Sequence, residues 1–228
     1  MTDKHEDTIT LQNDSELINL EPKILENRRT RLTEDNGWKL IRKENGLTVE
    51  EKYFDNQGIP MIRSTVYVKT QDENTMKSII EFIYSSKFKE RNEVYLEMRS
   101  HNILRNINDT IHIAQSCYNM PAGLPCREFL TARYFKNMGN GTYMMGVQSI
   151  DDKNIPIPSI FGNYMVRGTS NCGAMVCPTN NGYMVRTIDH ILPNGYLPNW
   201  VVNMFKTKVG DKLVRLVEYK CGNDAIIR

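Results

Sequence analysis

The chain has 228 residues, of which 40% are hydrophobic and 25% are charged, and its formal net charge is +2. These values are typical of a globular protein and exclude a disordered or fibrous one, and so small a net charge argues against nucleic-acid binding. No apolar stretch approaches the roughly 20 residues that span a membrane, and the N-terminus lacks the basic and apolar regions of a signal peptide. We therefore expect a cytoplasmic protein.

The cysteines and histidines are few and scattered. Five cysteines form an odd set without a CxxC pair, and none of the four histidines belongs to an HxxxH pair. Disulfide frameworks and zinc sites need paired or closely spaced ligands. The sequence therefore predicts reduced thiols, no metal site and no cofactor.

The N-terminal region begins with a polar tail, residues 1–14. From Ser15 onwards apolar residues recur at helical spacing, which predicts an amphipathic helix that Pro22 breaks or kinks. The basic run at residues 28–31 within this helix indicates a solvated face, with a phosphate-binding patch as the alternative. Three strand-like segments divided by the turn sequences ENG and DNQG then predict an antiparallel meander. They cover residues 38–46, 47–54 and 62–70.

Helical spacing returns over residues 71–92, where Asp72 is the expected N-cap and a second short helix follows near residues 87–93. Residues 101–191 then show a period of two in several segments separated by Asn-Gly turns, which predicts further strands. The final stretch predicts a long amphipathic helix that begins after Pro198 and ends at Gly222.

This order of elements contains no βαβ alternation. It predicts one α+β domain over residues 15–221, followed by a short tail at residues 222–228. In the expected helix-grip architecture, a curved antiparallel sheet of about nine strands surrounds the long C-terminal helix. Such a sheet leaves a cavity between itself and the helix.

The segment CREFLTAR carries two arginines on one strand face. Side chains alternate along a strand, so Arg127, Phe129, Thr131 and Arg133 point to the same side. A surface strand explains this pattern, and a functional cavity is the alternative.

Four stretches resemble the START domain, the StAR-related lipid-transfer family. GW followed by GLTVEEK is similar to the family's first strands, CREFLTAR to its R-D-F-V-x-x-R strand, MVRGTSNCGAMVCP to its paired late strands, and NGYLPNWVVN to its G-x-L-P-x-W-x-x-N entry to the last helix. The likeness covers about residues 30–220. It implies non-catalytic binding and transfer of one lipid or sterol in an internal tunnel, with the last helix as a lid.

The resemblance implies that Arg133 holds the polar head of the ligand. The family often pairs this arginine with an acid on the preceding strand, where the neutral Gln115 stands here. Because a buried arginine needs an anion, we expect a phospholipid rather than a sterol; another protein carboxylate is the alternative partner. Methionine side chains adapt to irregular apolar ligands, although ordinary core packing explains the methionines of the late strands and the last helix equally well. For His190, a structural role is the alternative. Further expected ligand contacts are Gln115, beside Arg133, and Phe129, Met144, Met175, Arg186, His190, Met204 and Phe205.

Two proline-containing loops, residues 118–126 and 151–163, are rich in apolar residues. The prolines keep them out of the sheet, and exposed apolar clusters mark partner or membrane surfaces. We expect both loops to flank the tunnel mouth and contact a membrane transiently, with packing into the core as the alternative. The expected membrane contacts are Met120, Leu124, Ile155, Ile157, Ile160 and Phe161.

Three functions remain open. A monomeric shuttle that moves lipid between membranes is favoured, a lipid or sterol sensor of the same fold is the second, and a helix-grip hydrolase or cyclase is the third. The late strands carry almost no acids on the face expected to point inward, and no G-x-S-x-G motif occurs. The sequence therefore predicts binding without catalysis.

Overall fold

The computed structural model describes residues 8–11, 13–54, 58–85, 87–121, 123–159 and 164–227. The helices are α1 (Asp14–Thr33), α2 (Glu73–Ser85), α3 (Phe88–Val94) and α4 (Asn199–Cys221). The strands are β1 (Ile9–Thr10), β2 (Lys39–Glu44), β3 (Leu47–Lys52), β4 (Met61–Val68), β5 (Met98–Asn106), β6 (Ile111–Tyr118), β7 (Cys126–Gly139), β8 (Thr142–Asp151), β9 (Met165–Arg167), β10 (Thr169–Thr179) and β11 (Gly182–Leu192).

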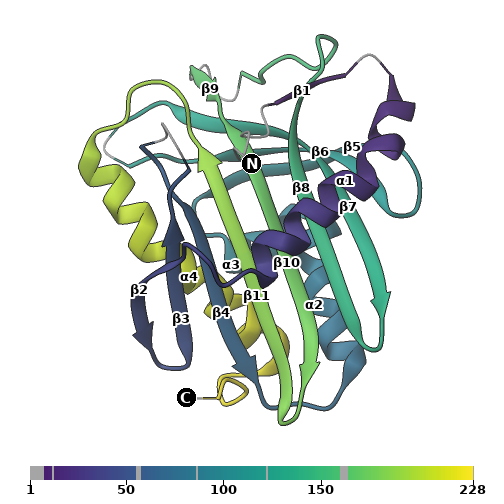
Figure 1. Ribbon diagram of the computed structural model, residues 1–228. Coiled ribbons are helices and arrows are strands. Elements are labelled where there is room, and N and C mark those ends of the chain that lie inside the picture. Colours follow the sequence, from purple (N-terminus) through teal and green to yellow (C-terminus); the bar gives the residue numbers. More distant parts are fainter. Residues whose placement is uncertain are drawn as a thin grey trace.

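Nine antiparallel strands form the main sheet, in the order β2-β3-β4-β11-β10-β8-β7-β6-β5. Two short strands lie off this path, since β1 pairs in parallel with β8 and β9 pairs in parallel with β7. Figure 1 shows α1 crossing one face of the sheet and α2 and α4 on the other. We call these the outer and inner faces. The predicted α+β fold, with a curved antiparallel sheet and a long C-terminal helix, is confirmed.

The outer face is covered by α1, whose apolar side is buried against the central strands. Leu17, Ile24 and Leu32 are at most 1% exposed and belong to one core cluster with residues of the sheet. The helix runs through Pro22 without interruption, so the predicted break is wrong. Proline removes one backbone donor, and burial of neighbouring apolar side chains at roughly 1.5–3 kcal/mol each outweighs that loss.

Two of the three arginines in the basic run of α1 are buried, so the predicted solvated face is wrong. The alternative, a basic patch that binds phosphate, is wrong for the same reason. Arg28 and Arg31 are 2% and 8% exposed, because the helix packs this side onto the sheet. Arg29 alone reaches solvent, where it pairs with Glu26 at 2.7 Å. The helical period therefore places Arg28 and Arg31 on the same buried side as the apolar residues.

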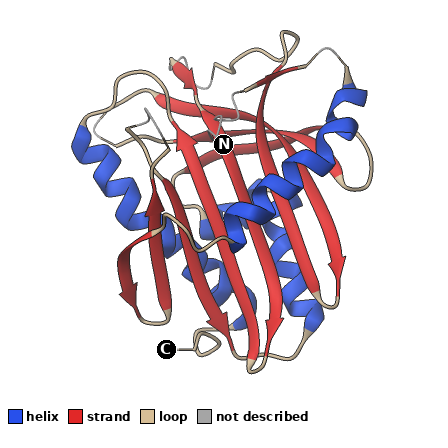
Figure 2. Cartoon of the chain, in the orientation of Figure 1, coloured by secondary structure: helices blue, strands red, loops and turns tan. Residues whose placement is uncertain are grey.

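The inner face packs against α2 and α4 in a second core, and Figure 2 shows the sheet lying between the two helical layers. The predicted helix ends are confirmed. Asp72 accepts hydrogen bonds from the backbone N–H groups of Asn74 and Thr75, while α4 starts after Pro198 and stops at Gly222 with φ of 90°. Among the described helices, none is long and apolar enough to cross a membrane.

Candidate functional site

A cavity of about 190 Å³ lies between the inner face of the sheet and α4. Its lining is mainly apolar and comes from both the strands and the helix, so closure depends on α4 resting against the sheet. Apolar side chains that line it include Ile62, Phe129, Val147, Ile191, Phe205 and Val209.

The CREFLTAR face lines this cavity. Arg127, Phe129, Thr131 and Arg133 all border it, and none is more than 8% exposed. The explanation as a surface strand is therefore excluded. The period of two identified one face correctly, and the sheet turns that face inward.

Arg133 is buried at the end of the cavity near α2 and α3. Its Nη1 donates to the carbonyl of Ile83 at 2.9 Å and its Nη2 to the hydroxyl of Ser116 at 3.4 Å. Its Nε has no hydrogen-bond partner, and Arg133 forms no ion pair with any carboxylate of the described residues. Burial lowers the pKa of its guanidinium to about 9, and the nearby charge of Arg91 adds to this effect.

Neutral histidines and a second arginine surround Arg133. His112 is its direct cross-strand partner on β6, and His101 Nδ1 lies 2.8 Å from the Ser116 hydroxyl. Burial and the two arginine charges lower the pKa of His112 to about 3 and lower that of His101 as well. Arg91 also lines the cavity and donates to the Ile83 carbonyl at 2.9 Å. This end of the cavity is therefore strongly positive.

The polar groups on the other walls have different partners. Arg127 is 1% exposed and donates to the carbonyls of Pro193 at 2.6 Å, Asn194 at 3.1 Å and Pro125. Asp189 borders the cavity on β11, where burial raises the pKa of its carboxyl. The guanidinium of Arg127 thus donates to three backbone carbonyls, whereas that of Arg133 donates to only one, the carbonyl of Ile83.

The model of the START domain matches residues 24–218, which covers most of the chain. The chain belongs to the START domain family. Comparison with curated proteins finds no match.

Solved START structures show the same fold. Human StAR-related lipid transfer protein 5 superposes with a TM-score of 0.78 at 19% identity, covering 91% of this chain and 98% of that protein. Human STARD10 gives 0.70 at 16% identity, covering 94% and 84%. A STAR-related lipid transfer protein from Xanthomonas axonopodis gives 0.65 at 18% identity, covering 81% and 98%.

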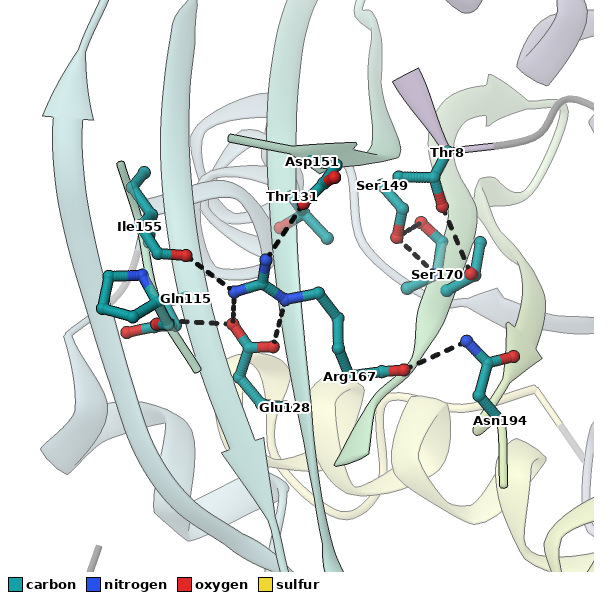
Figure 3. A network of polar contacts seen from close by, with 12 residues as sticks. Thr8, Gln115, Glu128, Thr131, Ser149, Asp151, Ile155, Arg167, Ser170 and Asn194 are labelled. Atoms are coloured by element: carbon teal, nitrogen blue, oxygen red, sulfur yellow. Dashed lines mark hydrogen bonds and ion pairs between the residues drawn. The ribbon is translucent and has the colours of Figure 1, made fainter. Parts of the chain in front are cut away.

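Within this START fold, Gln115 faces away from the cavity, contrary to expectation. Its amide donates to Glu128 at 2.9 Å and to the carbonyl of Pro156 at 3.3 Å on the outer side, where Arg167 pairs with Glu128 at 2.8 Å (Figure 3). The neighbouring Ser116 takes the place beside Arg133. Successive residues of a strand point to opposite faces. The expectation for the position beside Arg133 was therefore wrong by one residue.

Four other expected ligand contacts lie under α1 on the outer face, so the structure places them away from the cavity. Met144 and Met175 pack in the core cluster that α1 covers. Arg186 donates to the carbonyl of Leu32 on α1 at 2.7 Å, and the ring of His190 lies 5.8 Å from that of Phe54. The reason is shared: α1 covers the face that these residues occupy, and the cavity lies on the other.

The remaining expected contacts come from α4 and the two loops. Phe205 and Met120 line the cavity, whereas Met204 is half-buried outside its lining. In the loops, Leu124 is half-buried, Ile155 packs against the outer core, and Ile157 is 43% exposed. Ile160 and Phe161 lie outside the described residues.

Sequence reasoning missed several polar residues of the site. On β11, Asp189 lies on the strand face opposite to that of Arg186 and His190, which point outward. The period of two therefore predicts that Asp189 faces the cavity once the inner face of the sheet is known. Arg91 and Glu97 also line the cavity. They lie in and just after a short polar helix that carries no signal of a site.

Proposed function

We propose that this START domain binds one lipid molecule in the cavity and carries it between membranes without changing it chemically. The observation that carries the proposal is Arg133, a buried guanidinium at one end of a largely apolar cavity with no carboxylate partner in the described chain. Apolar walls suit acyl chains, and a buried cation favours an anionic group beside it. We therefore propose a phosphate-bearing lipid rather than a sterol.

Entry of such a lipid requires the cavity to open. The cavity volume of about 190 Å³ is smaller than a lipid with two acyl chains. The N-terminal half of α4 contributes Val202, Phe205 and Val209 to the lining, while Leu213 and Leu216 of its C-terminal half are buried in the inner core. We propose that the first half moves outward to admit the ligand and the second half stays in place.

An aromatic surface near the cavity supports membrane contact. Tyr196 and Trp200 are 81% and 51% exposed and flank Leu197, which lines the cavity. Tyr164, which is 76% exposed, immediately precedes β9, and Figure 1 places β9 at the same end of the molecule as the connection between β11 and α4. Tyrosine and tryptophan are favoured where a protein meets the lipid headgroup region. We propose a monomer that contacts cytoplasmic membrane surfaces peripherally through this end.

Binding rather than catalysis is supported by the state of the cavity thiol. Cys172 lines the cavity, and burial raises the pKa of its thiol to about 12. A thiol in this state is a poor nucleophile, because the thiolate is the reactive form. A lipid sensor of the same fold is the second candidate, since the same cavity would serve it.

Two measurements test this function. Native mass spectrometry of the purified protein should detect one intact phospholipid; a tightly bound sterol or a chemically altered lipid would contradict the proposal. A liposome assay with fluorescent phosphatidylcholine should then show transfer, and binding without transfer would favour the sensor.

The membrane surface is tested separately with Tyr196→Ser and Trp200→Ser together. We expect transfer to slow by about tenfold and vesicle co-sedimentation to fall, while lipid binding in solution stays unchanged. Tyr67→Ser, which removes an exposed tyrosine from β4 far from this end, is the matched control. Transfer at the normal rate in the double variant would refute the role of this surface.

A further inference from the structure

The neighbouring strands β8 and β10 are paired over only part of their length. The ladder between these strands has four residue pairs and ends at Gly146↔Gly173. Beyond it, residues 147–149 of β8 and 169–172 of β10 run on without pairing to each other, while residues 150–151 of β8 pair with β1 instead. We call this unpaired part the seam.

The side chain of Arg28 bridges the two edges of the seam from α1. Its Nε donates to the carbonyl of Cys172 on β10 at 3.2 Å. Its Nη2 donates to the carbonyl of Val147 on β8 at 3.3 Å and to Oε1 of Gln148 at 2.7 Å. One guanidinium therefore supplies donors to backbone acceptors on both strands where the ladder supplies none.

Short polar side chains close the rest of the seam. The hydroxyl of Ser149 accepts a hydrogen bond from the backbone N–H of Ser170 at 2.7 Å, and the N–H of Ser149 donates to Asn171 at 3.2 Å. At the far end, the hydroxyl oxygens of Thr8 and Thr169 lie 3.3 Å apart. Figure 3 shows Ser149, Ser170 and Thr8 along this line.

The seam lies directly between α1 and the cavity. Val147, Ser170 and Cys172 line the cavity from its two edges. On the outer side, a Cβ atom at Gly173 would lie 3.2 Å from Cβ of Arg28, so the missing side chain makes room for the arginine. Arg28 is 2% exposed and separates the outer layer from the cavity wall.

We propose that the seam is a lateral opening of the cavity and that Arg28 is the positioning residue that keeps it closed. Without the guanidinium, the carbonyls on both edges lose their donors and must turn to water, which separates the strands. Water then reaches the cavity from the outer face, independently of the entry beside α4. This inference goes beyond lipid transfer, because it concerns the wall of the cavity and not the ligand.

Labelling of Cys172 with a small water-soluble thiol reagent tests the proposal without any lipid. One reporter chain keeps only Cys172, and a reference chain keeps only Cys117, which is 1% exposed on β6, two strands away from the seam. Cys172 is already half-buried rather than fully buried. In Arg28→Met we expect it to react about tenfold faster than in the unchanged chain, with little change at Cys117, because local opening exposes Cys172 further and global unfolding exposes both cysteines.

Two further variants complete the test. Arg28→Lys keeps the charge but not the fork that reaches both edges, so it should also accelerate Cys172 selectively; it replaces Arg28→Met if that variant does not fold. Arg31→Met removes another buried arginine of α1 and should leave the ratio of the two rates unchanged. An equal acceleration at both cysteines, or none at Cys172, would overturn the proposal. Neither result depends on whether the protein transfers lipid.

Discussion

Replacing Arg133 by methionine should weaken phospholipid binding and stabilise the lipid-free protein. The side chain keeps its approximate volume but loses a charge that burial disfavours, as the lowered pKa of about 9 against an ordinary 12.5 indicates. A shift of that size corresponds to a cost on the order of 5 kcal/mol for keeping the guanidinium charged. The buried charge therefore lowers the stability of the lipid-free fold.

The two protein partners of Arg133 keep other hydrogen bonds in the variant. The carbonyl of Ile83 still accepts from Arg91, and the hydroxyl of Ser116 still contacts His101. The lost bonds contribute about 1.5 kcal/mol each, the lower end of the range for a charged donor, so we expect a net gain of about 2 kcal/mol. For a chain of this size that raises Tm by about 4–8 °C.

Binding should change in the opposite direction. Loss of charge-assisted hydrogen bonds to a phosphate costs about 3 kcal/mol, which weakens phospholipid binding by about 100-fold. Calorimetry of the delipidated protein and titration with fluorescent phosphatidylcholine measure the two effects, and a fluorescent sterol should bind no more weakly than before.

Arg127→Met is the matched control, because this arginine lines the same cavity but is held by three backbone carbonyls. It should lower Tm, since those carbonyls lose their donor. A variant of Arg133 with a lowered Tm and unchanged phospholipid affinity would refute the reasoning and assign Arg133 a structural role.

Three further substitutions test the fold around the site. Glu128→Gln breaks the ion pair between the fully buried Glu128 and Arg167, whose side chain is 21% exposed. Thermal denaturation should therefore show a loss of about 2–3 kcal/mol, less than for a pair buried on both sides; a loss below about 1 kcal/mol would contradict it. Gly210→Ala places a Cβ 2.7 Å from Val49 and should cost about 1–3 kcal/mol despite the higher helix propensity of alanine; urea unfolding with an unchanged midpoint would refute this. His112 has a pKa lowered to about 3 by burial, so the unfolded chain binds more protons below about pH 6.5 and stability falls as the pH drops towards 3. His112→Gln should reduce that pH dependence in denaturation curves, and an unaltered slope would show that His112 does not contribute.

The helix ends and turns were predictable because they depend on local conformation. Asp72 caps α2 with its own carboxylate, and Gly222 ends α4 in a backbone conformation with positive φ. The turn between β2 and β3 likewise uses Asn45 and Gly46, both with positive φ. Such signals need no knowledge of distant residues, which is why the order of elements followed from the sequence.

The lining of the cavity was only partly predictable. Arg186 and His190 share one strand face, as expected, but α1 covers that face and their side chains pack beneath it. The same error placed Met144 and Met175 in the cavity, and a shift of one position exchanged Gln115 for Ser116. A period of two separates the faces of a strand without indicating which one faces the cavity.

The sequence by itself determined the α+β class, the START family and the common face of Arg127, Phe129, Thr131 and Arg133, because periodicity, turn residues and motif order are properties of the chain. Only the tertiary structure decided that this face borders a cavity and that Arg133 pairs with no carboxylate among the residues that the structure describes. It also decided that Arg28 bridges two strands. These features depend on which elements cover each face of the sheet. They arise from contacts between residues up to 144 positions apart, which no local pattern encodes.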